Sequence, residues 1–243
     1  MSIARTGLFA LAAVLTTAAA VIGASVQPAG KAPAKPAKKS YVIGLVAKSN
    51  SNPVFIAART GANDAAKEIG KQYGIEIKID WRTPVSEDGQ KQAEFIEQLV
   101  AAGADGIAVS ASDAAKLKTA IDAADAKGVP VATFDSDVPG SKRFAYYGTD
   151  DFACGQQVAA ELARAMGGKG VVAILAGNPN APNLQARVRG VKEGLAKFAD
   201  IKILDTYYHP ETPQDAVSKV EQVMAANPQI TGWAMVGGWP LFT

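Results

Sequence analysis

Polar and aromatic residues that could bind a ligand follow the apolar runs of this sequence. The set that we expect to bind combines carboxylates with an amide, an arginine and two aromatic rings: Asn52, Phe55, Asp135, Asp137, Arg187 and Trp239. Charged groups form hydrogen bonds with paired hydroxyls worth about 1.5–3 kcal/mol each, and aromatic faces cover the C–H face of a sugar ring. The mixture therefore favours a neutral polyhydroxy ligand.

Several of these residues also have a structural interpretation that the sequence leaves open. Asp135 could close a turn after its strand, and Phe55 could belong to a core. Trp239 could pack against a neighbouring segment of the chain. Arg187 and Arg189 lie two positions apart on a predicted helix, so only one of them can point into a cleft.

The sequence contains few of the residues that usually catalyse reactions or bind metal ions. One cysteine, Cys154, excludes an internal disulfide and a cysteine-built zinc site, and the one histidine, His209, has no second ligand at metal-binding spacing. We expect His209 at the surface or in a loop. Phosphate-binding glycine loops and the common nucleophile and metalloprotease motifs do not occur in the sequence. We therefore expect that the chain is not an enzyme and that it binds neither a metal ion nor a cofactor.

The elements that must position the binding residues alternate between strands and helices. Residues 41–47 form a continuous apolar run, typical of a strand buried on both faces, and a helix follows from Asn52 to Gly74. Residues 75–81 alternate apolar and charged side chains, which predicts a strand near a sheet edge with Trp81 in the core. The remaining predicted elements of this half are helices at 88–102 and 113–127 and strands at 106–110 and 131–134.

The same alternation restarts after a short segment at 145–148. It predicts helices at 151–166, 184–198 and 213–226 and strands at 171–176, 201–208 and 232–236. Alternating strands and helices form parallel sheets covered on both faces. The predicted fold is α/β, with two doubly wound parallel-sheet lobes at 41–147 and 148–243 and a ligand cleft between them. The second lobe would be incomplete, because a further helix and strand are expected after its third strand.

The first 40 residues are expected to lie outside this fold. They carry five Lys and Arg residues and no acid, and residues 7–24 form an apolar run ending in small residues. This layout is typical of a secretory signal peptide at 1–24, cleaved after Ala20 or Ala24, with an uncleaved membrane anchor as the alternative. Residues 25–40 have the Ala/Pro/Lys composition of a linker. The body from Tyr41 onward has 20 basic and 23 acidic residues, which gives no support to nucleic-acid binding.

Five stretches together resemble the periplasmic sugar-binding proteins of ABC importers, the group similar to ribose-binding protein. They are S-N-P-V-F at 51–55, V-P-V-A-T-F-D-S-D at 129–137, Y-G-T-D-D-F-A-C-G at 147–155, A-R-V-R-G at 186–190 and V-G-G-W-P-L-F at 236–242. The resemblance covers residues 41–243. It implies a type I periplasmic binding protein fold and an exported, periplasmic location.

The resemblance also implies roles for single residues. Asn52 and Phe55 would contact the sugar, and Asp135 would accept hydrogen bonds from its hydroxyls with Asp137 close by. Arg187 matches the arginine of the family, with Arg189 as the alternative. The chain departs from the family pattern at 150–151, where Asp151 replaces a ligand-binding asparagine, and at 237–239, where Trp239 suggests stacking in place of a hydrogen bond.

The function implied by the resemblance is capture of a monosaccharide or related small ligand by closure of two lobes about a hinge. The loaded protein, a monomer, would deliver its ligand to the membrane permease of an ABC transporter. Family members continue beyond Thr243, so the resemblance implies a chain truncated at its C-terminus. The alternatives are a sensory receptor for chemotaxis or kinase signalling and, less favoured, an enzyme of doubly wound fold. A transcription regulator would begin with a helix-turn-helix instead of an export signal.

Overall fold

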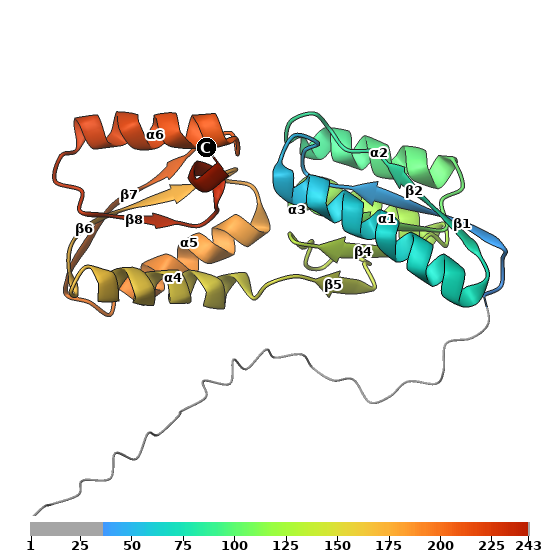
Figure 1. The fold of residues 1–243 in the computed structure, drawn as a ribbon, viewed down its shortest axis with the longest axis horizontal. Helices are drawn as coiled ribbons and strands as arrows, with labels where there is room; N and C mark the ends of the chain where they lie inside the picture. The colour runs from blue at the N-terminus through green and yellow to red at the C-terminus, as the bar shows by residue number, and fades with distance from the viewer. Residues whose placement is uncertain (1–35, 243) are drawn as a thin grey trace, which may run out of the picture. The chain divides into compact units, whose positions relative to one another are not determined.

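Both predicted lobes are present in the computed structural model, which describes residues 36–242 (Figure 1). The predicted signal peptide and the predicted linker up to residue 35 lie outside the described residues. Within the remainder of that linker, Lys38 forms an ion pair with Asp105, and the first strand already begins at Ser40.

The first lobe is built on a parallel sheet with the strand order β2-β1-β3-β4-β5. Its strands are β1 (Ser40–Val46), β2 (Glu76–Trp81), β3 (Gly106–Val109), β4 (Val131–Phe134) and β5 (Ala145–Tyr147). The connecting helices are α1 (Pro53–Tyr73), α2 (Gly89–Ala101) and α3 (Ala114–Ala126). The edge position predicted for the alternating strand is confirmed, because β2 pairs with β1 alone in this sheet.

Each helix of the first lobe begins just after the carboxyl end of a strand. Asn52, Asp88 and Asp113 are the N-cap residues, and the side chain of each accepts a hydrogen bond from a backbone N–H of the first helical turn. The central strands are buried between helices, with Ile96 of α2 and Leu117 of α3 fully buried in the core. The loops that carry these caps therefore all lie at one edge of the sheet.

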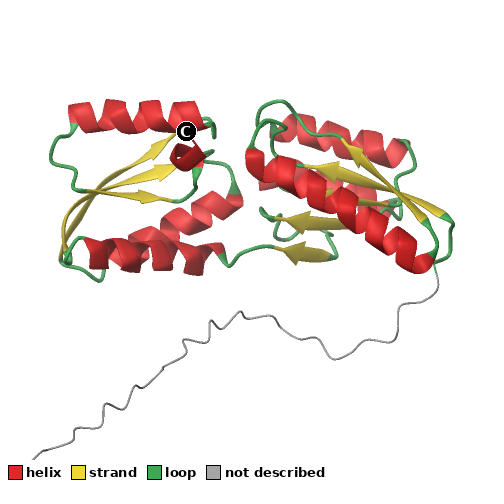
Figure 2. Ribbon diagram, viewed as in Figure 1, coloured by secondary structure: helices red, strands yellow, loops and turns green. Residues whose placement is uncertain are grey.

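The second lobe has a parallel sheet of three strands with the order β7-β6-β8. The strands are β6 (Lys169–Ala176), β7 (Asp200–Tyr208) and β8 (Gly232–Met235), and the helices are α4 (Asp151–Ala165), α5 (Pro182–Leu195), α6 (Pro213–Ala226) and the short 3-10 helix η1 (Trp239–Phe242). Helix α6 lies on one side of this sheet and α4 and α5 on the other (Figure 2). The central strand β6 is fully buried from Val172 to Ala176.

Helices α4 and α5 approach each other through glycines. A Cβ atom at Gly155 would lie 2.1 Å from the backbone oxygen of Arg187, and one at Gly190 would lie 2.2 Å from that of Phe152. Since neither contact leaves room for a side chain, the two backbones touch directly. The position of Arg187 on α5 is thereby fixed against α4.

The expectation that Trp81 lies in the core is wrong. Trp81 is only partly buried, outside the core, and the guanidinium of Arg59 lies 5.4 Å from its ring centroid. The edge position of β2 explains this exposure, because one side of the strand has no neighbour. Within residues 36–242, no helix combines the length and the apolar character needed to cross a membrane.

Candidate functional site

Strand ends from both lobes surround a cavity of about 90 Å³. In an α/β sheet of this kind, ligands bind outside the carboxyl ends of the strands. The lining residues from the predicted set are Asn52, Phe55, Asp135, Arg187 and Trp239. The cavity therefore brings together five of the seven predicted residues, three from the first lobe and two from the second.

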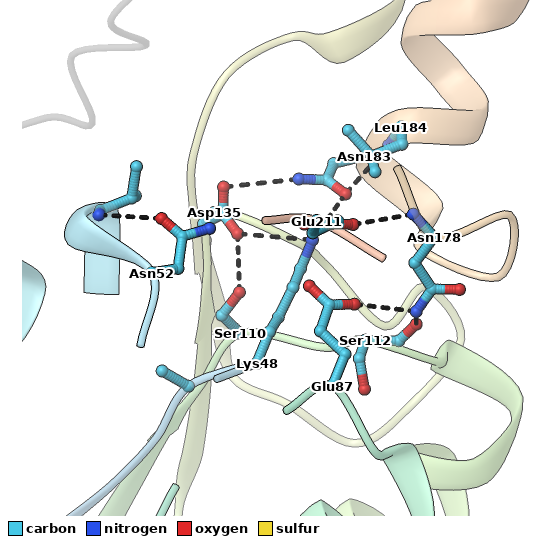
Figure 3. Close-up of polar contacts among 12 residues, drawn as sticks. Lys48, Asn52, Glu87, Ser110, Ser112, Asp135, Asn178, Asn183, Leu184 and Glu211 are labelled. Atoms are coloured by element: carbon cyan, nitrogen blue, oxygen red, sulfur yellow. Dashed lines mark hydrogen bonds and ion pairs between the residues drawn. The ribbon is translucent and has the colours of Figure 1, made fainter. Parts of the chain in front are cut away.

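Asp135 follows β4 and has a backbone conformation that few residues other than glycine adopt, with φ of 56°. Its carboxylate accepts hydrogen bonds from Ser110 Oγ at 2.7 Å and from Asn183 Nδ2 at 3.4 Å. Lys48 Nζ lies 3.9 Å away (Figure 3). Left-handed residues of this kind cluster at ligand sites, where the surrounding structure holds them in place. The geometry therefore favours a binding role over that of a simple turn residue.

Lys48 also lines the cavity, and the sequence reasoning missed it. Its side chain is 2% exposed, and its Nζ donates to Asn183 Oδ1 at 3.1 Å. Lys48 follows β1 and Asn183 lies on α5, so this buried hydrogen bond joins the two lobes. A signal was present in the sequence, because Lys48 directly follows the apolar run of the first strand, at a position where a polar side chain reaches the cleft.

Asn52 and Phe55 lie at the start of α1, on the first-lobe wall of the cavity. Asn52 Oδ1 accepts a hydrogen bond from the backbone N–H of Val54 at 3.0 Å, which fixes the side chain as the N-cap. Its amide nitrogen is on the side of Asp135 (Figure 3). Phe55 is 3% exposed and contributes its ring to the cavity wall. Phe55 is therefore buried, and it is also placed where a ligand in the cavity would lie against it.

Arg187 forms the opposite wall and is held by Asp151. Arg187 Nε donates to Asp151 Oδ1 at 2.8 Å, and Nη1 donates to the backbone oxygen of Val236 at 3.0 Å. Burial raises the pKa of Asp151, although the positive charge of Arg187 acts in the opposite direction. Asp151 positions Arg187 and is not among the residues that line the cavity. Arg189 is exposed and lines a separate cavity, as expected for two arginines on different faces of one helix.

Asp137 is placed outside the cavity, in an ion pair of its own. Arg143 binds both of its carboxylate oxygens, with Nη2 donating to Oδ2 at 2.6 Å, and Thr133 Oγ1 also donates to Oδ1. Burial opposes ionisation of Asp137, but these hydrogen bonds outweigh it and hold its pKa below the ordinary value. The structure therefore gives Asp137 a role in joining β4 to the segment before β5.

Trp239 and His209 pack against each other at the end of the second sheet. Trp239 is 5% exposed and belongs to the core of its lobe, so the packing interpretation applies to most of its surface. The His209 ring meets it edge-on, with centroids 4.7 Å apart. Of the two places expected for it, the surface or a loop, His209 occupies a loop, and it is buried there at 5% exposed. Neither ring nitrogen has a hydrogen-bond partner in the described structure. Burial lowers its pKa.

A second cavity, of about 660 Å³, is lined by loops of both lobes. The loops that follow β2, β3, β6 and β7 line it, and Glu211 belongs to the linings of both cavities. In the described part of the chain, no three His, Cys, Asp or Glu side chains are arranged to hold a metal ion.

Comparisons with known proteins agree with this geometry. A family model described as a periplasmic binding protein domain matches residues 43–242. Ribose import binding protein RbsB of Bacillus subtilis (strain 168) is 31% identical over 166 residues, which are 68% of this chain and 51% of that protein. The chain thus spans about half the length of this curated relative.

Solved structures show the same architecture. A solute-binding protein of Burkholderia graminis in complex with D-arabinose is 32% identical with a TM-score of 0.76, over 82% of this chain and 66% of that one. The fructose-binding periplasmic domain of a hybrid two-component system is 25% identical with a TM-score of 0.71, over 80% of this chain and 63% of that one. All three similar proteins are binding proteins, which supports at the family level the expectation that the chain is not an enzyme. The chain therefore belongs to the periplasmic binding protein family, and its two lobes have the type I fold of the family's sugar-binding members.

Proposed function

We propose that the chain captures a monosaccharide or a similar polyhydroxy ligand between its lobes and delivers it to the membrane permease of an ABC transporter. The observation that carries this proposal is the small cavity, which is lined both by Asp135 of one lobe and by Arg187 of the other. Ligand binding there would join both lobes, which is the requirement for capture by hinge closure.

The chemistry of the cavity suits hydroxyl groups. Asp135 supplies acceptor oxygens, while Lys48, Asn52 and Arg187 supply donors, so a sugar hydroxyl can both donate and accept. Two cations and two carboxylates line the cavity, since Glu211 complements Asp135. The lining therefore has no net formal charge, which favours a neutral ligand over a sugar acid or a sugar phosphate.

The remaining parts of the proposal concern the protein's location and partners. A signal peptide at 1–24, cleaved on export, and a linker up to residue 40 would place a monomeric binding protein in the periplasm. Membership in the periplasmic binding protein family supports this location. The ribose- and arabinose-binding relatives make pentoses the first ligands to test.

A thermal melt of the chain with D-ribose, D-arabinose, D-xylose, D-fructose and xylitol tests the proposal. A ligand at about 1,000 times its Kd stabilises the native state by about 4 kcal/mol, so one or more of these compounds should raise Tm by several degrees. Asp135→Asn should abolish the increase, and Asp137→Asn should retain it. If none of the compounds raises Tm, or if Asp135→Asn responds as the native chain does, the proposed sugar site is wrong.

Sensing is a second candidate function, favoured by the similarity to the fructose-binding domain of a hybrid two-component system. In that case the closed, loaded lobes would contact the extracellular part of a receptor instead of a permease. Stimulation of the ATPase of a reconstituted permease by the loaded chain would support transport. Binding of the loaded chain to a receptor domain, with no stimulation of the permease, would support sensing.

A further inference from the structure

The two lobes also contact each other outside the small cavity. Asn178, which follows β6, donates from its side-chain amide to Glu87 Oε2 at 2.8 Å and to the backbone oxygen of Ser112 at 3.1 Å (Figure 3). Glu87 precedes α2, and Ser112 precedes α3. One asparagine of the second lobe is thus bound to two loops of the first.

Glu211 completes this group from the loop between β7 and α6. The backbone N–H of Asn178 donates to Glu211 Oε1 at 2.9 Å. A Cβ atom at position 177 would lie 2.4 Å from Glu211 Cγ, so the glycine at this position allows Glu211 to approach. As a result, the carboxyl groups of Glu87 and Glu211, one from each lobe, are close enough to interact directly.

The Glu87 carboxyl has one oxygen that the described structure leaves without a partner. Glu87 Oε1 is buried and has no hydrogen bond. A buried, ionised carboxylate oxygen without a donor is costly, and a second carboxylate beside it adds repulsion. A proton on Glu87 removes both costs, because the resulting O–H can donate to Glu211. Consistent with this, burial together with the charge of Glu211 raises the pKa of Glu87 to about 8, against the opposing effect of Lys48.

We propose that Glu87, Asn178 and Glu211 form a clasp that holds the cleft closed and that takes up one proton as the lobes come together. The link to ligand binding rests on the proposed function, whereas the closing movement itself can be tested without a ligand. In an open cleft Glu87 would be solvated, with an ordinary carboxyl pKa of about 4.3.

The sign of the pH dependence follows from the extra proton in the closed state. Because the closed state binds more protons, closure is favoured at low pH and weakens as the pH rises from about 4.5 to about 8. For one proton the closed-to-open ratio falls by at most about tenfold per pH unit, and it levels off above about pH 8.

Other charged groups near Glu87 are either engaged elsewhere or gain a proton only in the acidic part of this range. Asp88 and Asp113 cap helices of the first lobe, and Lys116 lies 3.9 Å from Asp113. Burial lowers the pKa of His209, so it gains a proton only toward the acidic end of the range. Lys48 is the cation that acts directly on Glu87.

The experiment measures the distance between the lobes in the full chain without ligand. Spin labels are attached at Glu97→Cys on α2 and Glu221→Cys on α6, both exposed positions, in a Cys154→Ser background. Pulsed electron resonance then gives the closed fraction between pH 5.5 and pH 8.5. We expect the closed-to-open ratio to fall at least about fivefold over this range, within the limit set by one proton.

Two variants separate the clasp from a general effect of charge. Glu87→Gln carries a neutral amide that can donate to Glu211, so its closed fraction should be high and independent of pH. Asp113→Asn removes a neighbouring negative charge and keeps an N-cap side chain, so it should behave as the native chain does. The inference is overturned if the native distances do not change with pH, or if Glu87→Gln opens with pH as the native chain does.

A separate experiment with sugar ligands distinguishes the clasp from the proposed function. Calorimetry with D-ribose and D-arabinose, in buffers of different ionisation enthalpy near pH 6.5, should show uptake of up to about one proton per sugar bound. Absence of sugar binding with a pH-dependent distance would refute the proposed sugar function and retain the clasp. Sugar binding without proton uptake, by a chain that the spin labels show to be open before the sugar is added, would overturn the clasp.

Discussion

The ion pair between Arg187, which lines the cavity, and Asp151 can be tested by substitution. In Arg187→Ala, Asp151 loses the guanidinium that lies 2.8 Å from its carboxylate, and the Val236 carbonyl loses a donor. The side chains of Arg187 and Asp151 are 20% and 10% exposed, respectively, so water replaces the lost contacts only in part.

The expected loss can be estimated from this burial. Removing one partner of a fully buried ion pair costs about 3–5 kcal/mol, and the partial exposure here reduces the figure to about 2 kcal/mol. For a chain of this size the loss corresponds to a decrease in Tm of about 4–8 °C. Burial already raises the pKa of Asp151, and loss of Arg187 raises it further. A raised native-state pKa costs stability as the pH rises, so the loss in Arg187→Ala should be smaller at pH 5 than at pH 7.

Calorimetric melts of Arg187→Ala, Asp151→Asn and the double variant provide the assay. The double variant should be at least about 1 kcal/mol more stable than the sum of the single effects predicts, because it leaves no unpaired buried charge. Arg189→Ala, an exposed arginine on the same helix, is the control and should change Tm little. Additive single effects, or a loss in Arg187→Ala that is the same at pH 5 and pH 7, would refute the reasoning.

Three further substitutions test other features of the site. His209→Phe should stabilise the chain by about 1 kcal/mol, because two buried ring nitrogens without partners are removed. Since burial lowers the His209 pKa, the gain should increase below about pH 6.5 in thermal melts, and a gain that is constant with pH would contradict this. Asp137→Asn should cost about 1–2 kcal/mol in urea unfolding at pH 7 and progressively less below about pH 3.9, because the unfolded carboxyl then takes up a proton while the native one, whose pKa is depressed, stays ionised to lower pH. A cost that stays the same from pH 7 down to about pH 2 would contradict the ion-pair role. Lys48→Met should shift cleft closure to higher pH in the spin-label assay, since Lys48 lowers the pKa of Glu87, and a shift to lower pH would contradict the clasp.

Local patterns made most elements predictable from the sequence. The strand predicted at 131–134 matches β4, and the helix predicted from Asn52 to Gly74 matches α1 with its two capping residues. Apolar runs and caps act within a few residues, so one sequence carries the necessary information. The rule that ligands bind at strand ends likewise pointed to Asp135, and the resemblance to sugar-binding proteins pointed to Arg187; both line the cavity.

Contacts between distant segments could not be predicted in the same way. The bond between Lys48 and Asn183, and that between Glu87 and Asn178, depend on which loops of the two lobes meet. The burial of His209 could not be predicted because it comes from Trp239, thirty positions later in the chain. Asp137 has the residue type and spacing of a ligand-binding carboxylate, and only the position of Arg143 shows its structural role.

The glycine contacts between α4 and α5 have a consequence for how the site can evolve. Because the two backbones touch at Gly155 and Gly190, α4 and α5 are held together as one unit. Arg187 lies on α5, and the connection between the lobes leads into the start of α4. A larger residue at either glycine would push α4 and α5 apart and displace Arg187 from the cavity wall. New ligand preferences are therefore expected to arise by substitutions in the loops after β1 and β4, which can vary without moving α4 and α5.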